Sequence, residues 1–93
     1  MGRVLQLDER YARTYSALRL SREARAAVAR TMARLQASGA LPLPGDFAAL
    51  RWPVGVAWAR EAGSFSLWVL YTFDERFVTL HELRSTRPVR VDE

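Results

Sequence analysis

The chain has 93 residues and a formal net charge of +4 at pH 7, which is the size of one small domain. Its 49% hydrophobic and 26% charged residues are ordinary globular composition and exclude disorder as the main description. The absence of cysteine excludes disulfides, thiolate metal sites and a cysteine nucleophile, and a single histidine, His81, leaves no histidine cluster for a metal. No apolar run is long enough to span a membrane, and no secretion leader opens the sequence. We therefore expect one cytoplasmic domain over residues 1–93, without metal or cofactor.

All 14 basic residues are arginine. Coding bias in a GC-rich genome produces this pattern, and arginine also suits planar, bidentate recognition of phosphate. Residues 1–40 hold eight arginines against three acids, whereas residues 41–93 hold six against seven. The excess charge therefore belongs to the N-terminal half, and its sign favours an anionic partner, either a nucleic acid or an acidic protein.

The N-terminal half predicts one strand and two helices. Residues 3–7 alternate as a strand, and Asp8 is a natural N-cap for a helix over 9–19. Ser21 is the next N-cap, for a helix over 22–38 that Gly39 ends. The Pro/Gly-rich connection 39–53 follows, in which we expect a short helical turn at 46–50 and core contacts from Phe47, Leu50 and Trp52.

The C-terminal half has period-two alternation, which predicts strands. We expect strands over 54–60, 65–73 and 77–84, with turns at 61–64 and 74–76 and a tail that extends the sheet or frays. The fold class is thus α+β in the order β-α-α-β-β-β, with a helical hairpin packed on one face of a small, mainly antiparallel sheet. No element remains to cover the opposite face, which is solvated, a binding cleft or a dimer surface.

Three patches in this order resemble the RelE/ParE superfamily of toxins from bacterial toxin–antitoxin systems. They are residues 7–10 (LDER), residues 67–73 (LWVLYTF) with 77–80 (FVTL), and the exit 80–88 (LHELRSTRP). Leu80, His81 and the basic Arg84 are similar to the HigB branch, and Arg87 is similar to RelE. The resemblance implies a metal-independent, ribosome-associated mRNA endonuclease that inhibits translation and is held inactive by a cognate antitoxin protein.

On this resemblance, Arg87 and Arg84 bind the phosphate and stabilise its developing charge, and His81 moves a proton. The simpler interpretations are solvated arginines near a strand end and a half-exposed sheet histidine. We expect RNA contacts from Arg51, Arg60, Trp68 and Arg90. Strand parity puts Arg60 on the face of Val56 and Trp58. It therefore lies at the rim of the core if that face is buried, and it points toward RNA beside Trp58 if that face is the open cleft. Trp68 is either a stacking platform or part of ordinary sheet or dimer packing.

The chain departs from the family pattern in three places. Val56 and Trp58 stand where RelE-type toxins carry lysines, Trp68 stands where they carry an arginine, and no tyrosine follows Tyr71. These departures keep two alternatives open. One is a ParE-like, non-nucleolytic toxin acting on gyrase, and the other is a non-toxic interaction module with the same fold, in the form of a homodimer through the open sheet face.

Overall fold

The computed structural model describes residues 2–51 and 55–92. The elements are β1 (Val4–Leu7), α1 (Glu9–Leu18), α2 (Arg22–Ala37), β2 (Phe47–Arg51), β3 (Gly55–Glu61), β4 (Trp68–Phe73) and β5 (Phe77–Arg84). The strands form one mixed sheet in the spatial order β1-β5-β4-β3-β2, with β1 parallel to β5 and the other pairs antiparallel. The expected α+β class, with a helical hairpin on a mainly antiparallel sheet, is confirmed.

Both helices begin at the residues that the sequence predicts. The Asp8 side chain accepts a hydrogen bond from the backbone N–H of Arg10, and the Ser21 side chain accepts one from that of Ala24. These contacts satisfy backbone donors that a helix start leaves without a partner. The two caps thus set the bounds of the hairpin.

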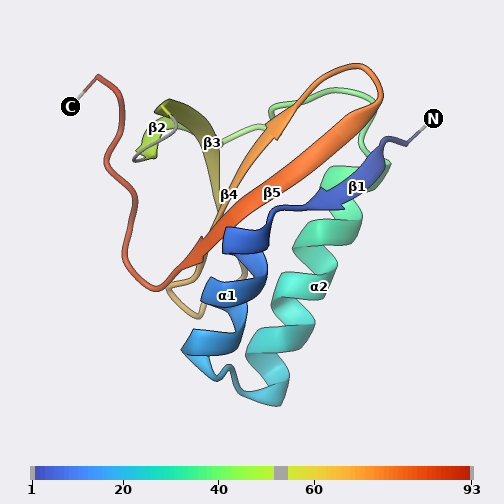
Figure 1. Ribbon diagram of the computed structural model, residues 1–93. Coiled ribbons are helices and arrows are strands. Elements are labelled where there is room, and N and C mark those ends of the chain that lie inside the picture. Colours follow the sequence, from blue (N-terminus) through green and yellow to red (C-terminus); the bar gives the residue numbers. More distant parts are fainter. Residues whose placement is uncertain (1, 52–54, 93) are drawn as a thin grey trace.

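The helices lie together against one face of the sheet (Figure 1). Tyr11 of α1 and Val28 and Leu35 of α2 pack against buried residues of β4 and β5, including Val69 and Leu80. The Thr14 hydroxyl of α1 also accepts the backbone N–H of Leu83 at 3.0 Å. This layer is the main core, and it leaves the opposite face of the sheet to other contacts.

Strand β2 corrects one prediction. A short helical turn was expected at residues 46–50, but residues 47–51 pair with β3 in a regular antiparallel register that joins Phe47 to Ala59 and Ala49 to Ala57. Phe47 and Ala49 are buried on the face away from the helices, whereas Leu50 is exposed. Buried and exposed side chains thus alternate along residues 47–50, as in a strand with one covered face. The segment forms a strand although Pro and Gly residues flank it. The expected core contact of Trp52 and the position of Val54 lie outside the described residues.

A second correction concerns the strand expected over residues 65–73, since β4 begins only at Trp68. The preceding turn is longer than predicted. Gly63 and Ser66 have positive φ values of 66° and 54°, and Phe65 is 41% exposed. The turn closes where the Ala62 N–H donates to the Leu67 carbonyl at 2.8 Å.

The C-terminal tail crosses toward the far edge of the sheet (Figure 1). Arg90 forms a bridge with Ala49 of β2, through bonds of 3.0 Å from Leu50 N–H to the Val89 carbonyl and from Val91 N–H to the Ala48 carbonyl. Pro88 is fully buried. Of the two expectations for the tail, extension of the sheet is therefore the one that is confirmed. The expectation that no element covers the second face is wrong in part, because Arg87 and Arg90 of the tail lie over the Phe47 ring. Neither helix of the described chain is long and apolar enough to cross a membrane.

Candidate nucleic-acid interface

The face of the sheet away from the helices carries an arginine–aromatic cluster, composed of Phe47, Trp68, Arg84, Arg87 and Arg90. The Phe47 and Trp68 rings pack against each other in a tilted arrangement, with their centroids 5.8 Å apart. The guanidinium carbons of Arg87 and Arg90 lie 4.8 Å and 5.0 Å from the Phe47 ring centroid. Arg84 of β5 lies directly across from Trp68 of β4. Cation–π attraction and ring packing thus hold two tail arginines beside the sheet.

A cavity of about 340 Å³ opens beside this cluster. Four of the residues expected to contact substrate line it, namely Arg60, Trp68, Arg87 and Arg90. Asp46 and Glu61 add two carboxylates to the same wall. The cavity therefore combines an aromatic ring and arginines, which suit a base and a phosphate, with two carboxylates, which do not suit a phosphate.

Several of these arginines already have acidic partners. Arg84 Nε lies 3.2 Å from Glu82 Oε2, and Arg90 Nε lies 3.4 Å from Asp92 Oδ1. The Arg90 and Asp92 side chains are 44% and 80% exposed, so this pair is highly solvated. Exposed pairs contribute little to stability, and a phosphate group can take the place of the carboxylate at low free-energy cost.

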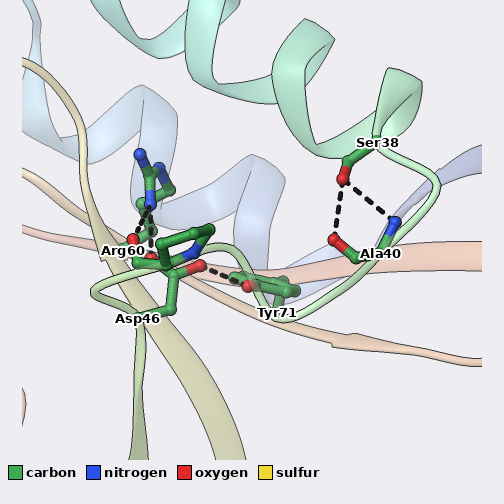
Figure 2. A network of polar contacts seen from close by, with 6 residues as sticks. Ser38, Ala40, Asp46, Arg60 and Tyr71 are labelled. Carbon is green, nitrogen blue, oxygen red and sulfur yellow. Dashed lines mark hydrogen bonds and ion pairs between the residues drawn. The ribbon is translucent and has the colours of Figure 1, made fainter.

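Arg60 differs from the others because its partner is buried. Its Nη1 lies 2.6 Å from Asp46 Oδ1, and the Asp46 side chain is only 2% exposed. The Tyr71 hydroxyl donates to the second oxygen of the same carboxylate (Figure 2). Burial raises the pKa of Tyr71, and its hydrogen bond to Asp46 raises it further. Arg60 therefore belongs to a structural network at the rim of the core, as strand parity with Trp58 indicates, while it also lines the cavity.

A β-bulge decides where His81 points. The register of β4 and β5 shifts between Leu70, which faces Glu82, and Tyr71, which faces Leu80, so His81 is the additional residue. Leu80 and Leu83 are buried under the helices, whereas His81 and Glu82 between them are both half-buried. Simple alternation would put His81 and Glu82 on opposite faces, and the bulge turns both away from the helices.

His81 contacts two polar side chains that the sequence does not single out as site residues. Its Nδ1 lies 3.0 Å from Asp8 Oδ2, and its Nε2 lies 2.7 Å from Thr72 Oγ1. Asp8 stands out in the sequence only as a helix cap, and Thr72 only as a residue of the strand expected over 65–73. A carboxylate next to a histidine fixes which ring nitrogen carries the proton.

Most of the expected site residues thus fall into two neighbourhoods of the face away from the helices, whereas Arg60 is on the helix side of β3 and reaches the cavity at its rim. Arg60, Trp68, Arg87 and Arg90 surround the cavity, and Arg84 lies next to Trp68. His81 is three residues before Arg84 on β5 and faces β1 and β4 instead. The side chain of Arg51 lies outside the described residues. Phe47 is the member that the sequence assigned only to the core, and its alternation with Ala49 was the available signal.

Comparison with known proteins gave no match to a family model, to a curated protein or to a solved structure. Within residues 2–51 and 55–92, no group of three or more His, Asp or Glu side chains is arranged to hold a metal ion. The features of the chain that bear on function are therefore the geometry of the open face and the resemblance of the sequence patches.

Proposed function

We propose that the protein is the toxin of a type II toxin–antitoxin system, an mRNA endonuclease of the RelE/HigB kind that acts at the ribosome. The observation that carries this proposal is the arginine–aromatic cluster on the face opposite the helical hairpin. Arginines suit bidentate contact with phosphate, and an aromatic ring offers a stacking surface to a base. Both lie on the face where the resemblance puts the RNA.

In this proposal Arg84 and Arg87 hold the scissile phosphate, and Trp68 stacks on a neighbouring base. The 2′ oxygen forms a bond to phosphorus, the bond from phosphorus to the 5′ oxygen breaks, and a cyclic phosphate remains. His81 takes the proton of the 2′ hydroxyl and returns it to the departing 5′ oxygen. Two guanidinium groups stabilise the charge that develops on the phosphorane oxygens, which is the largest contribution that such a site makes.

The proposed partners are the mRNA and ribosome on the open face and an antitoxin protein on the helices. Arg13, Arg22 and Arg30 are exposed on the hairpin. A groove of about 310 Å³ between the two helices is lined by Tyr11, Tyr15, Val28, Met32 and Arg25, among others. An apolar groove with a cationic rim fits an acidic, amphipathic segment of an antitoxin.

A ParE-like, non-nucleolytic toxin that acts on gyrase is the second candidate. The ion pairs of Arg60, Arg84 and Arg90 favour it, since each of these guanidinium groups is already balanced by a carboxylate. Such a surface recognises a protein through complementary charge as readily as it recognises a phosphate. The two candidates differ in whether cells that express the protein accumulate cleaved mRNA or damaged DNA.

The arginine pair gives a direct test. Expression of wild-type protein in a bacterium without an antitoxin should arrest growth, and the double variant Arg84→Ala/Arg87→Ala should not. The double variant Arg13→Ala/Arg22→Ala removes the same charge from the exposed side of the helices and is the matched control, which should still arrest growth. Arrest by the Arg84→Ala/Arg87→Ala variant at equal protein level would overturn the assignment of these arginines.

A further inference from the structure

Asp8, His81 and Thr72 form a continuous hydrogen-bonded chain across three elements. Asp8 follows β1 and caps α1, His81 is the bulge residue of β5, and Thr72 is on β4. The two distances that join them are 3.0 Å at Nδ1 of the imidazole and 2.7 Å at Nε2. The imidazole is therefore held at both nitrogens by residues far apart in the sequence.

The chemistry of the partners fixes the proton positions in the neutral ring. An ionised carboxylate only accepts hydrogen bonds, so Nδ1 of His81 must donate to Asp8. Nε2 then carries the lone pair, and the Thr72 hydroxyl donates to it. A hydroxyl donating to Nε2 while a carboxylate holds Nδ1 is the arrangement of a histidine general base.

Asp8 is itself held in place. Its Oδ1 accepts the Arg10 backbone N–H at 2.9 Å, and its own N–H donates to the Leu80 carbonyl at 2.9 Å. One carboxylate oxygen thus caps the helix while the other orients His81. The bulge that turns His81 away from the helices and the cap that holds Asp8 therefore serve the same contact.

We propose that Asp8 positions His81 as the proton acceptor for a substrate hydroxyl, and that the Thr72 hydroxyl occupies the place of that hydroxyl in the free protein. The catalytic part rests on the proposed function, in which the hydroxyl is the 2′ hydroxyl of RNA. Asp8 is a positioning residue in this scheme, and His81 is the catalytic residue. The RNA hydroxyl replaces Thr72 at Nε2 before its proton moves to the ring.

Asp8→Asn separates the two roles of Asp8. Asparagine caps helices as well as aspartate does, so α1 is retained. With its oxygen on the Arg10 N–H, the new amide turns its NH₂ group toward Nδ1 and requires the proton to move to Nε2. The variant therefore keeps the fold and reverses the tautomer. Asp74→Asn makes the same chemical change at the β4–β5 turn, where Asp74 accepts the N–H groups of Arg76 and Phe77, and is the matched control.

Nitrogen-15 NMR of the ring is the first measurement, and the single histidine of the chain makes its signals unambiguous. With the ring neutral, wild type and Asp74→Asn should show the Nδ1-protonated form, and Asp8→Asn should show the Nε2-protonated form. An Nε2-protonated ring in wild type, or an unchanged ring in Asp8→Asn, would overturn the positioning role whether or not the protein cleaves RNA.

Cleavage of mRNA by purified protein with ribosomes is the second measurement. Asp8→Asn should reduce the rate constant by about a hundredfold with little change in the half-saturating RNA concentration, since positioned proton transfer contributes at least that factor. Thr72→Val should raise the rate by roughly fivefold at most, the factor of one ordinary hydrogen bond. Equal cleavage by Asp8→Asn and wild type would overturn the catalytic role. If wild type itself does not cleave, the proposed function fails while the tautomer result still decides the positioning role.

Discussion

The carboxylate of Asp46 accepts a hydrogen bond from the hydroxyl of Tyr71, although the two residues belong to the loop before β2 and to the middle of β4. Arg60 of β3 contacts the same carboxylate, so one buried group ties the connection before β2 to two central strands (Figure 2). A buried charge needs such partners to offset its lost hydration. The network therefore fixes the wall of the cavity beside the arginine–aromatic cluster.

Removal of one hydroxyl from this network should weaken the fold measurably. Tyr71→Phe leaves the buried carboxylate of Asp46 with one hydrogen-bond partner fewer, and we expect the free energy of unfolding to fall by about 1.5–3 kcal/mol. Urea denaturation measures this change. Tyr15→Phe removes the same atom from a half-buried tyrosine of α1 and should cost clearly less. Equal losses in the two variants would mean that the contact with Asp46 adds no stability.

High pH should destabilise the protein through its buried tyrosines. Burial and the charge of Tyr15 raise the pKa of Tyr11 to about 12, and burial with the Asp46 contact raises that of Tyr71, against an ordinary value of 10.0. Above pH 10 the unfolded chain therefore loses tyrosine protons that the native state keeps. Below pH 10 both tyrosines are protonated in the folded and the unfolded chain, so their contribution to stability is fully present. Above pH 10 the free energy of unfolding falls as pH rises, by about 1.4 kcal/mol per pH unit per tyrosine.

The alkaline loss of stability can be assigned to the tyrosines, because the chain contains no lysine that would titrate in the same pH range. Urea denaturation at pH 9 and pH 11 gives the slope for wild type. The double variant Tyr11→Phe/Tyr71→Phe should show a much smaller slope, while its stability at pH 9 is lower. A slope that is unchanged in this variant would show that other groups cause the alkaline loss.

The tail should depend on the Phe47 ring. Phe47→Leu keeps an apolar side chain but removes the ring that contacts Arg87, Arg90 and Trp68, and we expect a loss of about 1–2 kcal/mol in the free energy of unfolding. Hydrogen exchange should report the local effect, with faster exchange at the N–H of Val91, which bonds to β2. Val78, at the centre of the main core, should exchange as in wild type after correction for global stability.

Nucleic-acid binding should show the arginines as phosphate contacts. We expect single-stranded RNA to bind with an affinity that falls steeply with salt, and Arg90→Ala should reduce the slope of log K against log salt by about 0.7. Trp68→Ala should instead weaken binding by about 1–3 kcal/mol at every salt concentration without changing the slope, because stacking releases no counterions. Identical salt slopes for wild type and Arg90→Ala would remove Arg90 from the RNA path.

Much of the fold follows from local signals, because caps and alternation act within a few residues. Asp8 and Ser21 predict both helix starts, and the last strand, over residues 77–84, has the predicted bounds. Strand β2 was missed because the Pro/Gly-rich flanks of Phe47 suggest a loop, and its strand state depends on pairing with β3. Pairing of this kind is a tertiary effect that propensity does not report.

The candidate site was less predictable for a different reason. Strand parity predicts the open face and the arginines of residues 80–88. The bulge at His81 reverses that parity, and no pattern of residues in the sequence predicts the bulge. Asp8 and Thr72 reach His81 only through the parallel pairing of β1 with β5 and the antiparallel pairing of β4 with β5. The sequence therefore supplies the members of the site more readily than their partners.

We propose that this protein cleaves mRNA, and mapping of mRNA ends after tightly induced expression in a bacterium without an antitoxin tests this activity in the cell. We predict growth arrest with new 5′ ends inside reading frames, detected by primer extension, and neither effect in cells that express Arg84→Ala/Arg87→Ala. Arrest with intact mRNA and damaged DNA would contradict this account in favour of a toxin acting on gyrase. Normal growth at full protein level would contradict both and leave a non-toxic interaction module.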